Sequence, residues 1–363
     1  DDYYGKLGQD PYDDEQGPTH VPMRVPGIDT ATSVTAGYYH SCALLANGTV
    51  WCWGSNEYGM LGQDYDEQGA THVPMRVPGI DSVLSIDAGD YHTCALLADG
   101  TVWCWGSNEY GMLGQDYDGD ISHVPMRVPG IDAVTGASLG NDYTCAVLAD
   151  GTVWCWGENS YGKSGRDYEP STTNYVPMQV SGIDNALSVS AGEYHTCAVL
   201  EDGTVWCWGD NEYGKLGHDY DEQGSTHVPM RVPGIDTATS VTAGYDHTCA
   251  VLADGTVWCW GSNEDSMLGQ AYLYDEHSGE FDGIPEYDNS THMPMQVSGI
   301  NTATSVSAGT EHTCALLADG TVWCWGNNEY GKLGQDYDEQ GPTHVPMQVP
   351  GIDTAIDMTL ETI

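Results

Sequence analysis

The residues with the clearest chemical potential are carboxylates gathered on short loops that contain glycine. The string Asp-Tyr-Asp-Glu-Gln-Gly occurs at 64–69, 219–224 and 336–341, and a relative of it at 11–17. Alternating carboxylates on such a loop offer the oxygen ligands that Ca²⁺ prefers. The spacing resembles the start of a calcium loop but lacks the distal bidentate glutamate. Weak calcium sites and solvated loops that only keep the protein soluble therefore both remain open. The carboxylates that would bind Ca²⁺ are Asp13, Asp14, Asp64, Asp66, Glu67, Asp116, Asp118, Asp120, Asp219, Asp221, Glu222, Asp336, Asp338 and Glu339.

The twelve cysteines form six pairs, and the members of each pair are ten residues apart. A three-residue loop that ends in glycine lies between them, which predicts a hairpin with a type I turn and a bulge. In that register Cys42 lies opposite Cys52 in a non-hydrogen-bonded pair, with Cα atoms about 4.5 Å apart, which a disulfide tolerates. Reduced core cysteines and zinc ligands are the alternatives, although the spacing exceeds that of zinc knuckles. The expected disulfides are Cys42–Cys52, Cys94–Cys104, Cys145–Cys155, Cys197–Cys207, Cys249–Cys259 and Cys314–Cys324. They predict an extracellular protein, secreted or held at the cell surface.

Histidine recurs at two fixed positions of a repeating unit, represented by His40 and His72. A residue that returns in nearly every unit is typical of structural hydrogen bonding, whereas a catalytic residue should be unique. The recurring tryptophans predict packing between units, with sugar stacking as the alternative. The sequence contains no glycine-rich phosphate loop and no nucleophile elbow. We therefore predict that the protein is not an enzyme.

The repeating unit decides the architecture that positions these residues. The tryptophans that open Trp-Cys-Trp-Gly are Trp51, Trp103, Trp154, Trp206, Trp258 and Trp323, with separations of 52, 51, 52, 52 and 65 residues. A fixed period of this size predicts a propeller or a solenoid. Each unit contains four strand-like segments, in the first unit at 33–36, from His40, from Thr49 and at 72–77, with turn residues between them. The sequence therefore predicts an all-β propeller of four-stranded blades.

The chain ends do not complete the last blade. Six full blades are expected over 30–351 of a single domain, 1–363, with an orphan fourth strand in 1–28 and an orphan first strand in 354–363. The chain starts at Asp1 without a methionine, which we interpret as a mature chain after processing. The incomplete seventh blade could close within one chain or pair with a neighbour by strand addition, and we favour head-to-tail homopolymers. The residues expected to mediate this assembly are Tyr3, Tyr4, Leu7, Ile356, Met358, Leu360 and Ile363.

The string AGxxHTCALLADGTVWCWGxNxxGxLG, followed by a strand that contains proline, resembles the regulator of chromosome condensation repeat. The resemblance covers nearly the whole chain and implies the seven-bladed propeller of that family. The cysteine pairs, the acidic loops and the missing basic arm depart from the nuclear members, so their guanine-nucleotide exchange activity is not expected. The resemblance is closer to secreted bacterial members, including β-lactamase-inhibitor proteins.

The formal net charge of −45 on 363 residues limits the partners. It excludes nucleic acid and anionic membrane surfaces, because both are bound by basic residues. No apolar run reaches the roughly 20 residues of a membrane span. The fifth unit carries a unique insert, 271–292, in which Phe281, Tyr274 and Tyr287 would bind a partner. Asn47 and Asn289 begin glycosylation sequons. We expect a self-assembling, Ca²⁺-stabilised extracellular propeller, or alternatively a secreted monomer that binds a protein or a glycan.

Overall fold

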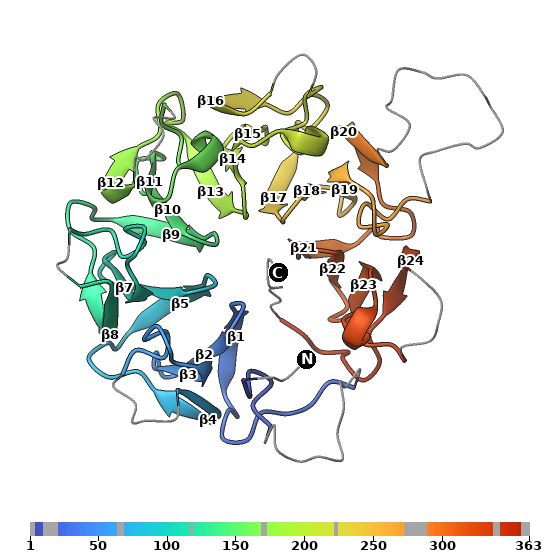
Figure 1. Cartoon of the computed structure of the whole chain (residues 1–363). Coiled ribbons are helices and arrows are strands. Elements are labelled where there is room, and N and C mark those ends of the chain that lie inside the picture. The colour runs from blue at the N-terminus through green and yellow to red at the C-terminus, as the bar shows by residue number, and fades with distance from the viewer. Residues whose placement is uncertain are drawn as a thin grey trace, which may run out of the picture.

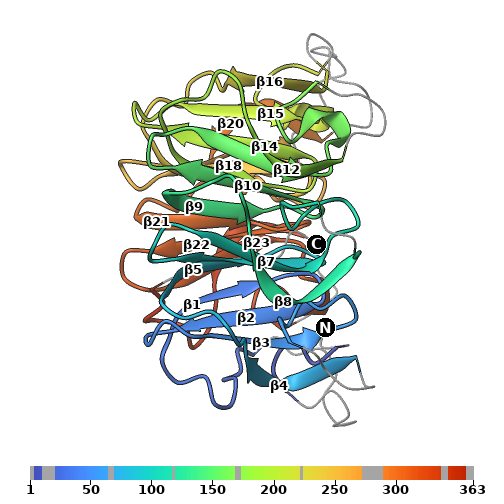
Figure 2. The same cartoon turned by 90° about the vertical axis from the view of Figure 1, so that its left-hand side faces the viewer.

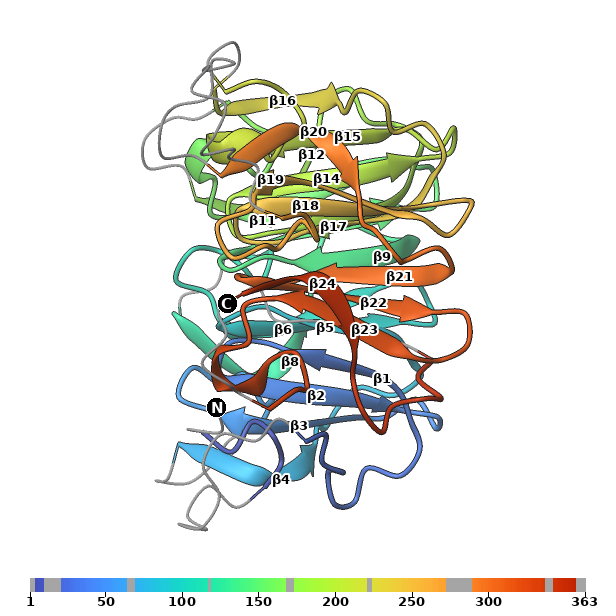
Figure 3. The same ribbon diagram turned by 90° about the vertical axis from the view of Figure 1, so that its right-hand side faces the viewer.

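A computed structural model describes residues 4–9, 21–63, 69–116, 119–167, 173–220, 224–271, 289–336 and 342–356. The described strands form six four-stranded antiparallel sheets, each built from consecutive strands. The sheets surround a common axis as the blades of a propeller (Figure 1). Edge-on views show a disc whose strands run between two opposite faces (Figures 2 and 3). The all-β propeller predicted from the repeat is therefore confirmed.

Each blade begins at the axis and ends at the rim, in the order first to fourth strand (Figure 1). Blades 1 and 2 contain β1(Ala31–Ala36), β2(His40–Leu45), β3(Val50–Ser55), β4(Ala70–Arg76), β5(Val83–Ala88), β6(His92–Leu97), β7(Val102–Ser107) and β8(Ile121–Arg127). Blades 3 and 4 contain β9(Val134–Leu139), β10(Tyr143–Leu148), β11(Val153–Gly157), β12(Asn174–Gln179), β13(Ala186–Ala191), β14(His195–Leu200), β15(Val205–Gly209) and β16(Thr226–Arg231). Blades 5 and 6 contain β17(Ala238–Ala243), β18(His247–Leu252), β19(Val257–Ser262), β20(Ser290–Gln296), β21(Ala303–Ala308), β22(His312–Leu317), β23(Val322–Gly326) and β24(Thr343–Gln348). Three single-turn 3₁₀ helices follow the third strands of blades 3, 4 and 6: η1(Ser160–Gly162), η2(Glu212–Gly214) and η3(Glu329–Gly331).

The central hairpin of each blade has the register predicted from the turn. In blade 1, Cys42 pairs with Cys52 and Leu44 with Val50. The turn is closed by the Gly48 amide, which donates to the Leu45 carbonyl at 2.8 Å. Gly48 adopts φ +76°, a left-handed conformation that favours glycine. In the structure every cysteine pair ten residues apart forms a disulfide, with Cα atoms 4.1 Å apart.

The hydrophobic core lies between neighbouring blades. The Cys42–Cys52 disulfide, Val50 and Val77 of blade 1 pack against the buried Trp105 of blade 2. The same cluster recurs at each following junction, up to Trp325 of blade 6. Sheets with an apolar face must bury it against another element. Each blade is therefore stabilised mainly by the next blade.

The recurring histidines also link blades, as the sequence predicted for structural residues. The ring Nε2 of His40 lies 2.7 Å from the hydroxyl of Thr93 in the next blade, and His92 contacts Thr144 in the same way. In blade 3, Tyr143 replaces histidine, and its hydroxyl lies 2.8 Å from that of Thr196. Burial lowers the pKa of His40 to about 3, so its imidazole is neutral.

The region of the expected seventh blade contains no strand among the described residues. Residues 21–25, part of the orphan fourth strand expected within 1–28, have no strand pairing, because no third strand lies beside them in the described part of the chain. Ala355 and Ile356 are likewise outside any strand, and residues 357–363 lie outside the described part of the chain. The described segments nearest the two chain ends lie in the gap between blades 6 and 1 (Figures 1 and 3).

The described residues include no helix that is both long and apolar enough to traverse a lipid bilayer.

Candidate functional site: a ring of tyrosines and carboxylates

Two loops of every blade meet at the same face of the disc. One is the short turn between the first and second strands, at Gly37–Tyr39 in blade 1, and the other follows the third strand, at 56–63. Because consecutive strands are antiparallel, these connections share one face, and the hairpin tips lie on the other. Side chains from both loops form a ring around the mouth of the central channel, which we call the crown. Its members are Tyr4, Tyr38, Tyr39, Tyr58, Asp90, Tyr91, Tyr110, Asn141, Asp142, Tyr161, Glu193, Tyr194, Tyr213, Tyr245, Asp246, Glu311 and Tyr330.

Backbone conformation places several loop tyrosines at the surface. Tyr161, Tyr213 and Tyr330 adopt φ values of 59°, 63° and 60°. Bulky residues rarely adopt this left-handed conformation, which costs on the order of 1–3 kcal/mol. Tyr161 and Tyr330 keep about half of their surface exposed, 48% and 51%. The turn therefore maintains a strained conformation that displays an aromatic ring.

The tyrosines of adjacent blades pack against each other. Tyr58 of blade 1 meets Tyr91 of blade 2 edge-on, with ring centroids 5.2 Å apart. Tyr161 of blade 3 contacts Tyr194 of blade 4 in the same geometry at 5.8 Å, and Tyr194 continues to Tyr245 at 5.1 Å. Edge-to-face pairs of this kind hold aromatic rings in fixed orientations. The crown therefore presents a rigid aromatic surface.

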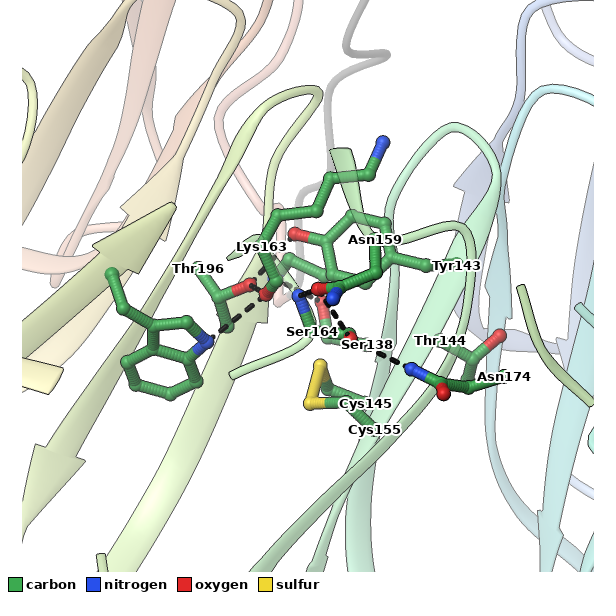
Figure 4. Close-up of a disulfide and its surroundings, with 12 residues drawn as sticks. Ser138, Tyr143, Thr144, Cys145, Cys155, Asn159, Lys163, Ser164, Asn174 and Thr196 are labelled. Atoms are coloured by element: carbon green, nitrogen blue, oxygen red, sulfur yellow. Dashed lines mark hydrogen bonds between the residues drawn. A yellow bond between two sulfur atoms is a disulfide. The ribbon is translucent and has the colours of Figure 1, made fainter. Parts of the chain in front are cut away.

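Lysines beneath this surface are already neutralised. The ammonium group of Lys215 is fully buried, bonds to Asp210 at 2.8 Å and Asp246 at 2.6 Å, and lies 5.3 Å from the Tyr194 ring centre. In blade 3, Lys163 bonds to Glu158 at 2.6 Å and lies beside the ring of Tyr143 (Figure 4). These ion pairs neutralise the lysines locally, and Lys163 in addition lowers the pKa of the nearby Asp142 and Glu193.

The crown carboxyl groups of Asp142 and Glu193 form no ion pair among the described residues, although Lys163 lies near both. Burial raises the pKa of Asp142 to about 6 despite the charge of Lys163, and the carboxylates of Glu193 and Glu158 raise it further. Burial likewise raises the pKa of Glu193. The Oδ1 atom of Asp142 is buried and has no hydrogen-bond partner among the described residues. A cationic group brought to this point would therefore stabilise the ionised carboxylates.

The arginines are concentrated on the opposite face. Arg76, Arg127 and Arg231 end the fourth strands of blades 1, 2 and 4, and each bonds an exposed aspartate five residues later in the chain. Fourth strands run away from the crown, so these cations lie at the other face of the disc. The opposite face also carries exposed hairpin-tip carboxylates, such as Asp150 and Asp254, so both faces of the disc are acidic.

Among the described residues, two acids, Asp87 and Asp90, line a cavity of the central channel. The cavity of about 200 Å³ is lined by Asp87, Asp90, Ser138, Ser190 and other first-strand residues. Asp87 accepts hydrogen bonds from the Thr35 hydroxyl at 3.1 Å and from the Leu139 amide at 2.9 Å. Burial raises its pKa to about 6, although these bonds oppose the rise. Blades 3 and 4 have serine at the same position, so Asp87 is an exception within the repeat.

The predicted calcium ligands fall mostly outside the described residues. This holds for Asp13, Asp14, Asp64, Asp66, Glu67, Asp118, Asp221, Glu222, Asp338 and Glu339. The described ligands Asp116, Asp120, Asp219 and Asp336 are exposed. Within the described ranges, no three His, Cys, Asp or Glu side chains gather closely enough to bind a metal ion.

Of the residues predicted for assembly, partner binding and glycosylation, some lie outside the described part of the chain and the others lie at different places in the fold. Of the assembly residues, Tyr3, Met358, Leu360 and Ile363 lie outside the described residues, as do Phe281, Tyr274 and Tyr287 of the insert. Tyr4 contacts Tyr39 in the crown with ring centroids 5.3 Å apart, Leu7 is partly exposed, and Ile356 is 78% exposed. Asn47 is exposed at a hairpin tip, whereas the amide nitrogen of Asn289 donates to the Asn263 carbonyl.

Sequence reasoning did not identify the crown. One signal was available: the two residues after the glycine of this turn vary between copies, as Tyr38-Tyr39, Asp90-Tyr91 and Asn141-Asp142 show, while the glycine itself repeats. Where one position varies among nearly identical repeats, its side chain is not needed for packing between the strands. Only the structure shows that these positions meet around one channel mouth.

Comparison with known sequences gives the family. The sequence model of the RCC1-like domain matches residues 1–360. The chain belongs to the RCC1-like domain family. It is similar to the ultraviolet-B receptor UVR8 of Arabidopsis thaliana, with 29% identity over 86% of this chain and 69% of that protein. It is also similar to the mouse regulator of chromosome condensation, with 26% identity over 94% of this chain and 82% of that protein. In the human E3 ubiquitin-protein ligase HERC2, the similar region covers only 6% of that protein, at 28% identity over 80% of this chain.

Solved structures agree with the fold. Prp20p from Saccharomyces cerevisiae, described with its binding to Gsp1p and histones, superposes with a TM-score of 0.80 and 23% identity over 96% of this chain and 84% of that one. Human WBSCR16 superposes with a TM-score of 0.80 and 21% identity over 94% of this chain and 87% of that one. At this level of identity, the likeness establishes the propeller architecture alone.

Proposed function

We propose that this chain is a non-catalytic propeller that binds a protein partner through the crown, and that the bound segment is cationic. The observation that carries the proposal is the uncompensated carboxyl cluster, in which burial raises the pKa of Asp142 and one Asp142 oxygen has no partner among the described residues. The exposed tyrosines supply the aromatic contacts that are enriched at protein interfaces. The net charge of −45 would attract a basic partner over long distances.

The relatives support a protein-binding role. The yeast propeller Prp20p binds Gsp1p and histones. We extend to this chain only the general role, protein recognition by a propeller. The six disulfides support work in an oxidising compartment, so we propose a secreted or cell-surface protein.

A labelled oligolysine peptide and an uncharged peptide of equal length test the charge requirement by fluorescence anisotropy. Oligolysine should bind more tightly as pH rises through about 6, because Asp142 becomes ionised there. A triple variant, Asp90→Asn, Asp142→Asn and Glu193→Gln, should weaken binding about tenfold, which equals about 1.4 kcal/mol.

The matched control replaces three hairpin-tip aspartates of the opposite face, Asp150, Asp254 and Asp319, by asparagine, which blade 1 has at the same position as Asn47. Its net charge equals that of the crown variant, so only the location of the change differs. Binding by this control should change less than about twofold. Equal weakening of both variants would show that net charge alone attracts the peptide and that the crown is no site.

Self-assembly is a second candidate function, favoured by the 78% exposure of Ile356, which follows the last described strand. In this proposal the ends complete a seventh blade between neighbouring molecules, and Ca²⁺ at the acidic loops screens their mutual repulsion. Light scattering at increasing concentration, with Ca²⁺ or with chelator, tests both parts. Deleting residues 355–363 should abolish polymers and leave six folded blades, and a truncated chain that still polymerises would overturn the proposal.

A further inference from the structure

The crown already binds ammonium groups, and they come from its own lysines. In blade 4 the Nζ atom of Lys215 lies 2.6 Å from Asp246 of blade 5 and 2.8 Å from Asp210 of its own blade. The same atom lies 5.3 Å from the centre of the Tyr194 ring. A carboxylate beside an aromatic face binds a cation both by charge and by cation–π attraction. The junction between blades 4 and 5 therefore shows which ligand this arrangement accepts.

Methionine stands at the lysine position of blade 2. The Met112 carbonyl accepts the indole N–H of Trp156 at 2.8 Å. The Lys215 carbonyl accepts that of Trp260 at 2.9 Å, so the two loops hold equivalent places in their blades. The methionine side chain is uncharged, is shorter than lysine by the terminal nitrogen, and is only 1% exposed. It therefore fills the apolar part of the position and supplies no cation.

The tyrosine and the carboxylate that surround the lysine are nevertheless present at the junction between blades 2 and 3. Tyr91 stands where blade 4 has Tyr194, and Asp142 stands where blade 5 has Asp246. Burial raises the pKa of Tyr91 most, and the Asp142 carboxylate raises it further, which places that carboxylate near the ring. Burial likewise dominates at Tyr194, where Asp246 adds to the rise in pKa. The two junctions thus pair the same groups in the same way.

Asp142 has no cation bound to it among the described residues. Its Oδ1 atom is buried and has no hydrogen-bond partner there. Burial raises the pKa of Asp142, and Lys163 opposes the rise from nearby, but the Lys163 ammonium bonds to Glu158 at 2.6 Å. A buried carboxylate oxygen without a donor is costly, and a cation supplied by another molecule would remove that cost. The group that this junction lacks is therefore one ammonium ion.

The junction opens onto the crown surface. Tyr110 is 39% exposed, and Asp142 keeps part of its surface in contact with solvent. The Glu109 carboxylate, burial and then Asp142 raise the pKa of Tyr110, so these three residues lie around one opening. Blades 2 and 3 each have all four strands, and neither borders the gap between blades 6 and 1 (Figure 1). A side chain of a partner can therefore reach Asp142 from solution.

We propose that the junction between blades 2 and 3, bounded by Tyr91, Met112 and Asp142, is a binding site for one lysine side chain of the partner. We call it the lysine subsite. The incoming ammonium bonds to the Asp142 carboxylate beside the Tyr91 ring, as Lys215 bonds to its carboxylates within the chain. The inference rests on the proposed function, because the lysine belongs to the segment that the crown binds. It adds which side chain is recognised and where.

Filling the subsite from within the chain tests the proposal. Met112→Lys installs the residue that blade 4 has, so its ammonium should occupy Asp142 and weaken the binding of labelled oligolysine by about fivefold or more in fluorescence anisotropy. Met60→Lys is the matched control, because it adds the same charge to the same face one blade away. The residue that faces it in the next blade is Tyr91 instead of a carboxylate, so binding should change less than about twofold.

A second pair of variants guards against loss of folding, because it also supplies the acid that accompanies the lysine in blade 4. Ser107→Asp combined with Met112→Lys should unfold cooperatively near the melting temperature of the native chain and bind oligolysine as weakly as Met112→Lys. Ser55→Asp combined with Met60→Lys makes the same change in blade 1 and should leave binding unchanged. Both double variants keep the net charge of the native chain.

Cross-linking locates the site in the native protein. A water-soluble carbodiimide joins a lysine amine to a carboxylate in contact with it as an amide, and takes up the water released. A peptide that carries a single lysine and is capped at both ends should couple to Asp142, and the same peptide with acetyl-lysine should not couple. Peptide mapping by mass spectrometry identifies the coupled residue, and Met112→Lys should remove this product.

The outcomes distinguish this inference from the proposed function. Oligolysine binding that falls in the triple crown variant but is equal in Met112→Lys and Met60→Lys would overturn the lysine subsite and leave the proposed function in place. Binding that survives the triple crown variant would overturn both. Coupling located at the hairpin tips, or spread evenly over the carboxylates of the chain, would also overturn the subsite.

Discussion

The buried ion pair of blade 4 offers the sharpest test of how the crown is supported. Lys215 is fully buried, and its partners Asp210 and Asp246 are 8% and 22% exposed. Removing one partner of a buried pair costs about 3–5 kcal/mol, because an unpaired charge is left behind. Both carboxylates retain some contact with water, so Lys215→Met should reduce the free energy of unfolding by about 3 kcal/mol, the lower end of that range.

The chain itself supplies the compensating change. Where methionine stands at the position of Lys215, as in blades 1, 2 and 5, serine stands at the position of Asp210. Asp210→Ser alone should cost about 1 kcal/mol, because Lys215 keeps Asp246. The double variant should cost about 2 kcal/mol, which is about 2 less than the sum of the single variants.

Urea denaturation followed by tryptophan fluorescence, with the disulfides intact, measures all three values. Arg231→Met is the matched control, because its pair with Asp236 is exposed on both sides and should contribute no more than about 1 kcal/mol. A Lys215→Met variant that loses less than this control, or a double variant as unstable as the sum, would refute the reasoning.

Further predictions concern the disulfides, the buried titratable groups and calcium. Removing the Cys145–Cys155 bond by paired serine substitutions should lower the free energy of unfolding by about 2–3 kcal/mol, and non-reducing peptide maps should show only pairs within one blade. Burial raises the pKa of Asp87 to about 6 from 3.8, so stability from this group is complete below about pH 4 and is lost as pH rises through 6. Asp87→Ser should therefore stabilise the protein at pH 8 by about 2 kcal/mol and have little effect at pH 4 in thermal unfolding. Burial lowers the pKa of His92 to about 3 from 6.5, so its contribution is intact above pH 6.5 and is lost as pH falls toward 3. Because four further buried histidines behave in the same way, the unfolding midpoint of His92→Gln should still fall between pH 6.5 and 3, but less steeply than that of the native chain. Chelation should lower the melting temperature if Asp64 and its counterparts bind Ca²⁺, and an unchanged melting curve would mean that these loops only solubilise the chain.

The sequence alone determined the parts of this protein that are local and repeated. The hairpin register follows from a three-residue turn that ends in glycine, and that register places Cys42 opposite Cys52. The period of the tryptophans determined the blade, since the same four strands must bury the same face in every copy. A histidine present in nearly every unit was correctly predicted to be structural for the same reason.

Only the tertiary structure decided what lies between units. Residues of different blades, such as Tyr194 and Tyr245, are 51 apart in the chain and meet only because the ring closes around one axis. Residues 21–25 have the sequence of a fourth strand, yet they form no ladder, because no partner strand lies beside them among the described residues. Local sequence thus fixes each blade, whereas contacts between distant blades determine which surfaces remain available for binding.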